Sequence, residues 1–145
     1  MKQSLRIDVN PVPASRPRVS RFGTYYGPIY RKFKAMLATT LQQMGVTNFF
    51  GKDPIEVEIE CHVRRPKTTT LDMPRGDVDN YAKGVMDALN GVLWDDDVQI
   101  QKLTVTKQFA DVDSDGFIIV EVSDKQGSKK VAVPQLPTVR KRRKG

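Results

Sequence analysis

The segment from Gly76 to Ile100, GDVDNYAKGVMDALNGVLWDDDVQI, carries six aspartates in a chain whose formal net charge is +7. Carboxylates this close repel one another and raise one another's pKa unless a cation neutralises them. A divalent metal ion with oxygen ligands is the usual cation. The segment therefore predicts a metal site, and the basic composition predicts a polyanionic substrate that reacts there.

A helix is expected to orient these acids. Its apolar positions recur every three or four residues, as in a buried stripe: Val78, Tyr81, Ala82, Val85, Met86 and Leu89. Asp79, Lys83 and Asp87 are four apart and therefore stack on one exposed side, while Asp77 lies where an N-cap would. The aspartates at 95–97 meet Asp77 and Asp79 only if the return segment runs antiparallel to the helix or joins a strand beside its start.

Each acidic feature also has a simpler explanation. Asp77 by itself can be only a helix cap. Asp79 and Lys83 can be only an i,i+4 surface pair, worth ~0.3–0.5 kcal/mol. Three aspartates before a strand are commonly a solvated loop. The combination favours the metal site, because like charges at this density destabilise a fold that has no compensating ion.

The remaining pattern predicts an α+β fold, a single small domain with a mixed sheet and two main helices in the order β-α-β-α-β-β. Alternation predicts strands over 4–9, 55–63, 103–109 and 117–122. Prolines at 11, 13 and 17 predict a loop rich in Arg and Tyr before the first helix. That helix is expected to begin at Pro28, to end before Gly45 and to bury Ile29, Phe33, Met36, Leu37, Leu41 and Met44.

Two loops carry further expectations. The polar segment 64–75 is expected to move until substrate arrives. Asp115 and Gly116 are expected to form the turn of a hairpin that joins the last two strands. Asp111, Asp113 and Asp115 also resemble the start of an EF-hand calcium loop, but Val122 stands where that loop needs a bidentate Glu, so a polar turn explains them better.

Composition limits the possible classes of protein. Of the 24 Lys and Arg, eight lie after Asp124 and none of the 17 acids do, which predicts a near-neutral domain over 1–124 and a basic, disordered tail over 125–145. Cys61 and His62 are the only residues of their types, which excludes internal disulfides, zinc fingers and two-imidazole catalysis. Cys61 is expected in the core, as is Trp94, for which a dimer contact and, after it, base stacking are the alternatives. No stretch predicts a membrane span or a signal peptide, so a cytoplasmic location is expected.

The acidic segment resembles the signature of RusA-type Holliday junction resolvases, in their phage and prophage branch. The pattern is D-x-D-N-x-x-K, a D-A-L helix end and D-D-x-Q-I/V. The strand IEVEIECHV and the early P-x-P-x-S-R-P-R are also similar to that family, so the resemblance covers residues 4–122. One position departs from it: the family often has a basic residue directly before the first aspartate, where this chain has Gly76, with Arg75 one place earlier.

This resemblance implies a homodimer that cuts branched DNA at four-way junctions by paired symmetric nicks, in recombination and repair. It implies Asp77, Asp79 and Asp97 as metal-binding catalytic carboxylates, with Asp96 adjacent, and Lys83 as the catalytic lysine. The chemistry of such carboxylates is Mg²⁺-assisted phosphodiester hydrolysis, with Mn²⁺ possible and with one or two ions. Lys83 would donate to the scissile phosphate.

Basic residues outside the acidic segment are candidates for DNA phosphate contacts: Arg16, Arg18, Arg21, Arg64, Arg65, Lys67 and Arg75. They do not distinguish between two classes of protein. The favoured class is the nuclease, on the strength of the aspartates and Lys83. The alternative is a non-catalytic nucleic-acid-binding protein whose acidic patch is structural.

Overall fold

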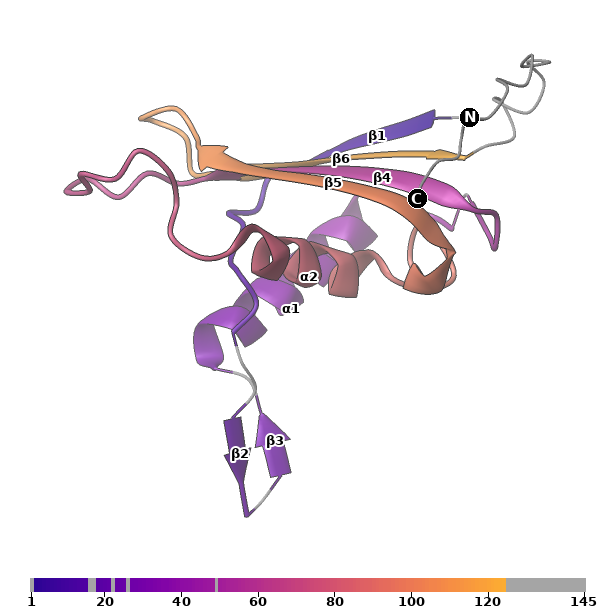
Figure 1. Ribbon diagram of the computed structural model, residues 1–145, viewed down its shortest axis with the longest axis horizontal. Helices are drawn as coiled ribbons and strands as arrows, with labels where there is room; N and C mark the ends of the chain where they lie inside the picture. The colour runs from indigo at the N-terminus through magenta and orange to yellow at the C-terminus, as the bar shows by residue number, and fades with distance from the viewer. Residues whose placement is uncertain (1, 16–17, 22, 26, 49, 125–145) are drawn as a thin grey trace, which may run out of the picture.

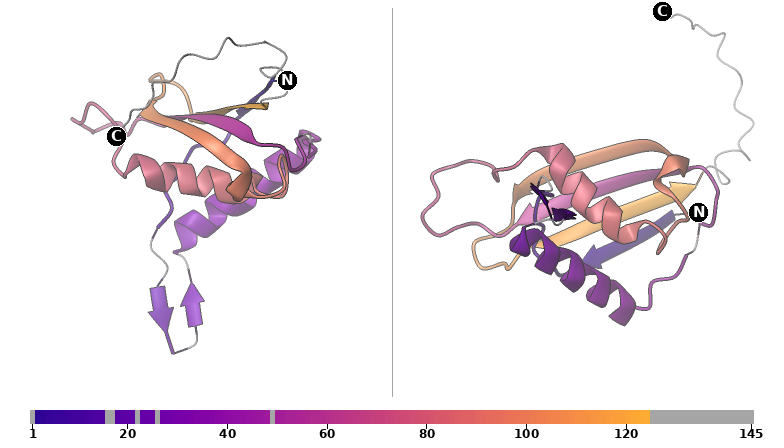
Figure 2. Two further views of the ribbon diagram at one scale, coloured as in Figure 1. Left: turned by 45° about the vertical axis from the view of Figure 1, so that its right-hand side comes forward. Right: turned by 90° about the horizontal axis from the view of Figure 1, so that it is seen from below.

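Four strands form a mixed sheet, and two helices cover one of its faces. The computed structural model describes residues 2–15, 18–21, 23–25, 27–48 and 50–124. The sheet has the order β1-β6-β4-β5, made of β1 (Lys2–Ile7), β6 (Phe117–Asp124), β4 (Ile55–Val63) and β5 (Ile100–Phe109). The helices α1 (Pro28–Gln43) and α2 (Val78–Leu89) lie on the same side of this sheet (Figures 1 and 2). The expected α+β class, mixed sheet and two main helices are confirmed.

The core lies between the sheet and the helices. Alternate residues of the central strand β4 are buried against the helical layer, and Cys61 is among them, as expected. The side chains between them, Glu56, Glu58 and Glu60, belong to the opposite face of the strand and are more exposed. Trp94 is completely buried, which confirms it as a core residue.

Both helices form where expected, but the buried stripe of α1 differs from the prediction. The stripe consists of Tyr30, Phe33, Leu37 and Leu41. Ile29 and Met36 are 73% and 48% exposed. At 3.6 residues per turn they lie roughly 90–100° around the helix from the buried stripe. Met44 comes after the last helical turn, as the C-cap, and is also exposed.

The predicted hairpin between the last two strands is wrong. The central strand β4 lies between them, parallel to β5 and antiparallel to β6. The connection over residues 110–116 therefore crosses the end of β4, a distance of about 10 Å between strands that are two places apart in the sheet. A two-residue turn at Asp115 and Gly116 is too short for this step, whereas seven residues are sufficient.

The segment before α1 is also not the loop that was expected. It contains the short strands β2 (Arg18–Ser20) and β3 (Gly23–Tyr25), which pair antiparallel. Strands of three residues are too short to leave a periodic pattern in the sequence. This hairpin projects away from the body of the molecule (Figure 1). The expected tail, residues 125–145, lies outside the described residues, and none of the described helices has the length and apolar character needed to cross a membrane.

Candidate functional site

Strand β4, helix α2 and strand β5 form a parallel β-α-β unit. Since β4 and β5 are parallel, α2 must run back antiparallel to both of them. The start of α2 consequently lies at the edge of the sheet where β4 and β5 end, with Val63 paired to Phe109. In open α/β sheets, this edge beyond the carboxyl ends of parallel strands is where ligands bind.

Two carboxylates stand at the start of α2. Asp77 is the N-cap residue, as predicted, but its side chain makes no capping hydrogen bond. Asp79 lies in the first helical turn, and both residues are exposed. Among the described residues, neither carboxylate takes part in a hydrogen bond or an ion pair. Both side chains therefore present free oxygen ligands to a cation.

Side chains hold the backbone that leads into Asp77. The Lys107 ammonium donates to the carbonyl oxygens of Pro74 at 2.9 Å and of Gly76 at 2.6 Å. The Tyr81 hydroxyl donates to the carbonyl oxygen of Arg75 at 2.8 Å. Burial raises the pKa of Tyr81 to about 12, with a smaller contribution from Cys61, so this hydroxyl keeps its proton. Three successive carbonyl groups are thus fixed, and with them the position of Asp77.

Gly76 explains the absence of a basic residue directly before the first aspartate. Its φ is +94°, and a Cβ atom there would lie 3.0 Å from the ring of Pro13. A larger residue would be strained in this conformation and crowded by that ring. A positive charge still lies beside the position, because the ammonium of Lys107 is bonded to the Gly76 carbonyl.

Sequence reasoning missed Lys107. On β5 it follows Leu103 and Val105 at every second position, so it belongs to the face of the sheet that packs against the helices. A charged residue in an inward-facing position of a strand was the signal that could have identified it, because such a charge needs specific partners.

Lys83 lies one turn after Asp79 on α2. Its ammonium is 3.4 Å from the carboxylate of Asp87, which also accepts a hydrogen bond from the Tyr30 hydroxyl at 3.2 Å. The structure therefore pairs Lys83 with the following acid on the helix. Lys83 is exposed, so its ammonium can be reached by a substrate.

The triple aspartate lies at the other end of α2. Asp96 caps the short helix η1 (Asp97–Gln99): its carboxylate accepts from Val98 N at 3.2 Å, and Gln99 completes the capping box. The carboxylate of Asp97 accepts from the indole of Trp94 at 3.0 Å. Asp95 bonds to Asn48. Of the three, Asp96 has the clearest structural role.

The four predicted metal ligands are not brought together in one chain. Helix α2 has 12 residues and is about 18 Å long. Along β5, the seven steps from Ile100 to Lys107 cover roughly 23 Å. Asp97 precedes the first of these residues and Asp77 adjoins the last. Within the described part of the chain, no group of three or more His, Cys, Asp or Glu side chains could hold a metal ion.

Several of the predicted DNA-binding residues lie at the same end as Asp77. Arg64, Arg65, Lys67 and Arg75 belong to the loop between β4 and α2 and are exposed. The Arg65 guanidinium lies 4.9 Å from the centre of the Phe109 ring. Arg18 and Arg21 belong to the β2–β3 hairpin, which leaves the body near the start of α2 (Figures 1 and 2). Arg16 is outside the described residues.

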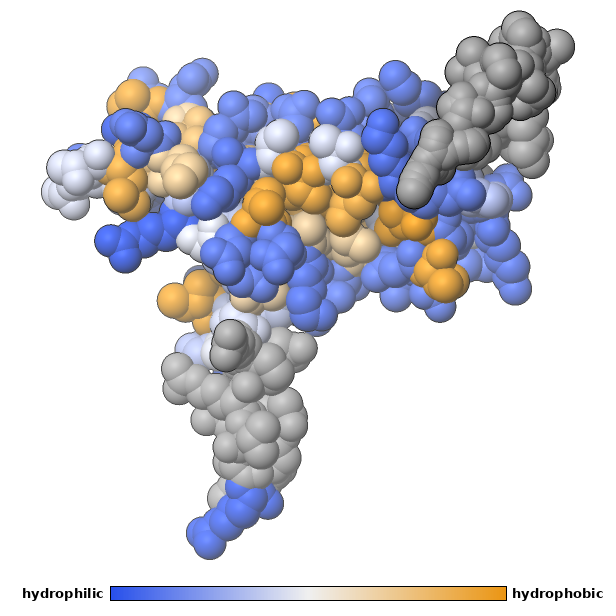
Figure 3. Space-filling view, viewed as in Figure 1, coloured by the Kyte–Doolittle hydropathy of each residue, from blue (hydrophilic) through white to orange (hydrophobic). Residues whose placement is uncertain are grey.

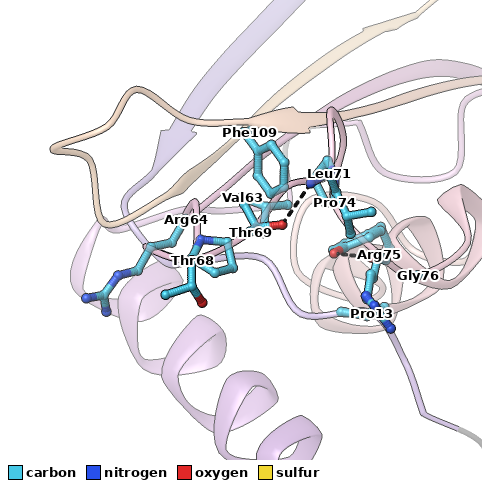
Figure 4. A pocket seen from close by; sticks show the side chains of 12 residues that line it. Pro13, Val63, Arg64, Thr68, Thr69, Leu71, Pro74, Arg75, Gly76 and Phe109 are labelled. Atoms are coloured by element: carbon cyan, nitrogen blue, oxygen red, sulfur yellow. Dashed lines mark hydrogen bonds between the residues drawn. The ribbon is translucent and has the colours of Figure 1, made fainter.

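Two neighbouring cavities open beside Asp77. One, of about 490 Å³, lies between the 64–75 loop and the ends of β4 and β5 (Figure 4). The other, of about 680 Å³, includes Asp77 and Lys107. They share four lining residues: Leu71, Pro74, Arg75 and Gly76.

Comparison with known proteins gives one family. Residues 8–122 match the family model described as endodeoxyribonuclease RusA. The chain is also 47% identical, over 134 residues, to the uncharacterized protein YqaN of Bacillus subtilis (strain 168), and this match covers 78% of the chain and 92% of the relative.

Proposed function

The chain belongs to the RusA endodeoxyribonuclease family, and from this premise we propose that it is a structure-specific endonuclease that resolves four-way DNA junctions by paired symmetric nicks. The observation that carries the proposal is the pair of free carboxylates, Asp77 and Asp79, held at the start of α2 with Lys83 one turn away. A non-catalytic DNA-binding role would not need acids at a surface that must accept phosphates.

Asp77 and Asp79 fit a hard divalent cation, since both offer only oxygen ligands and neither is engaged elsewhere among the described residues. We assign Mg²⁺ to them, with Mn²⁺ as a substitute. When bound, such an ion lowers the pKa of a coordinated water and neutralises charge on the leaving oxygen of the phosphodiester.

A homodimer would supply the missing ligands. In a dimer with a two-fold axis, antiparallel α2 helices would place Asp77 and Asp79 of one chain beside Asp97 of the other, with Asp96 adjacent. Such a pairing has a suitable surface, because β5 is an edge strand of the described sheet. Figure 3 shows apolar side chains gathered over β5 and the adjoining side of α2. Leu103 and Val78, which are 41% and 39% exposed, belong to these two elements.

Lys83 acts as the phosphate-binding cation of the site. Its exposed ammonium would leave the weak pairing with Asp87 and donate to a non-bridging oxygen of the scissile phosphate. The loop arginines and Lys67 neutralise neighbouring phosphates and hold the DNA backbone across the carboxyl edge of β4 and β5.

A nicking assay tests the proposal. Labelled four-way junction and linear duplex of the same arm sequence are incubated with the full chain in Mg²⁺ or in EDTA. Symmetric nicks on the junction alone, in Mg²⁺ alone, are expected. Binding to both substrates with no metal-dependent nick under any divalent ion would instead favour the non-catalytic alternative.

A further inference from the structure

We propose that the 490 Å³ cavity under the 64–75 loop is a nucleobase pocket, which takes an unstacked base of the DNA next to the scissile phosphate. This inference rests on the proposed nuclease function. The cavity is separate from the predicted metal ligands, none of which lines it. Its volume lies within the ~300–1,000 Å³ of ordinary small-molecule sites.

The walls have the chemistry that a base requires. The side chains of Phe109, Val63 and Pro66 supply apolar surface, and an aromatic ring such as that of Phe109 can stack on any base. Thr68 and Thr69 place hydroxyl groups at the same cavity (Figure 4), where they can hydrogen-bond a base edge.

Charge argues against a basic occupant and for an anionic one such as DNA. Arg64 and Arg75 line the cavity, and no lining residue is an acid. Arg65 is outside the cavity but lies over the ring of Phe109, so three arginines line or adjoin the cavity. Phosphates on either side of an inserted base would therefore meet positive charge.

Position connects the pocket to the reaction. The cavity shares Arg75 and Gly76 with the neighbouring one, which contains Asp77. A DNA strand whose phosphate lies at Asp77 would therefore have the pocket close by, because Gly76, the residue before Asp77, lines it. Pro74, Arg75 and Gly76, whose carbonyl groups are fixed by hydrogen bonds, line both cavities.

Such a pocket would give selectivity for branched DNA. Extracting a base from an intact duplex costs stacking and pairing energy, and the cost is least where pairing is already disturbed. Bases at a branch point are disturbed in this way, so a junction can fill the pocket at lower cost than a linear duplex. We infer that base capture contributes to the choice of junction over duplex.

A photo-crosslink tests the occupant. 5-Iodo-2′-deoxyuridine is placed on each side of the phosphate that the nicking assay identifies, and the full chain is irradiated with this junction in EDTA. We expect an adduct on Phe109 or on the peptide over residues 63–81. An adduct that maps elsewhere, in a complex that has formed, overturns the proposal.

Two tryptophan variants of the same loop provide the second arm. Leu71→Trp is designed to fill the cavity, whereas Thr70→Trp places the same side chain at a loop position that does not line it. Leu71→Trp should remove the adduct and lower the junction-to-duplex affinity ratio about tenfold or more, while Thr70→Trp changes neither by more than about twofold. An unchanged ratio and adduct in Leu71→Trp would contradict base capture.

The outcomes separate this proposal from the nuclease function. If the parent protein nicks junctions but gives no adduct in the cavity, only the pocket is wrong. If it gives the adduct but nicks nothing in any divalent metal, the nuclease assignment fails and the base site stands. A third outcome is that the parent gives no adduct and that Leu71→Trp changes the mass of the protein measured by sedimentation. The cavity would then receive a side chain of a partner chain, and the proposal would be overturned.

Discussion

The ammonium of Lys107 lies 2.6 Å from the carbonyl oxygen of Gly76, the residue directly before Asp77. A residue of β5 thus fixes the backbone directly before α2, although Lys107 and Gly76 are 31 positions apart in the chain. A lysine from an inward-facing strand position thus fixes the backbone that leads into Asp77, and it acts on this carboxylate through the backbone. Its role is to position the site.

Lys107→Met should lower the nicking rate about 10- to 100-fold, because a shift of ~1 Å in a catalytic group has effects of this size. Junction affinity should change less than about threefold, since one lysine contributes little to the total attraction. The measurement is kcat set against Kd for the same junction. Lys102→Met is the matched control, because Lys102 lies on the same strand with its side chain toward the opposite face. An equal loss in the control would contradict the positioning role.

Asp79→Asn should abolish nicking while junction binding stays the same or becomes tighter. The change removes a metal ligand and also removes repulsion toward phosphate. Gel-shift affinity in EDTA and nicking in Mg²⁺ measure the two effects separately. Asp113→Asn, in the loop between β5 and β6, removes the same charge at an exposed site and should leave nicking unchanged. Comparable rates in Asp79→Asn and the parent protein would remove Asp79 from the site.

Mixing two inactive variants tests whether each site is shared between chains. Asp79→Asn and Asp97→Asn should each be inactive alone. A dimer with one chain of each type keeps one site in which both carboxylates are intact, if Asp97 comes from the partner chain. An equal mixture, after subunit exchange, should therefore recover about a quarter of the parent's nicking, as single nicks. No recovery, despite exchange shown by native mass spectrometry, would mean that the sites are not shared.

Lys83→Ala should lower the nicking rate far more than the junction affinity, because its contact with the phosphate strengthens in the transition state. The melting temperature should hardly change, since the exposed pair with Asp87 contributes only ~0.3–0.5 kcal/mol. Lys52→Ala serves as the control for loss of one exposed positive charge. If affinity fell as much as rate, Lys83 would be a docking residue.

Truncation after Asp124 should weaken binding to all forms of DNA and leave junction-specific nicking in place. Residues 125–145 carry eight positive charges and no acid. Each phosphate neutralised contributes about −0.9 to the slope of log affinity against log salt, so the slope should flatten by several units. A chain of full length whose eight tail Lys and Arg are replaced by Ser should behave like the truncation. Loss of junction selectivity with an unchanged slope would assign structure recognition to the tail.

Local patterns were enough to predict most of the elements and to identify the candidate site residues. The alternation over 55–63 gave β4 with its bounds, and the spacing from Val78 to Leu89 predicted α2 with Asp77 at its cap. These signals depend on side-chain periods of 2 and 3.6, which neighbouring residues along the chain determine. Asp77, Asp79 and Lys83 could be proposed as site residues for the same reason, since they lie within two turns of one helix.

The tertiary structure decided which residues meet. Strand order made β4 the neighbour of both β5 and β6, so the expected hairpin did not form. Because β4 and β5 are parallel, Asp97 and Asp77 lie at opposite ends of α2, and Lys107 lies beside Gly76. Pairing partners and strand direction depend on contacts between residues far apart in the chain, which burial of a common core selects and which no local period encodes.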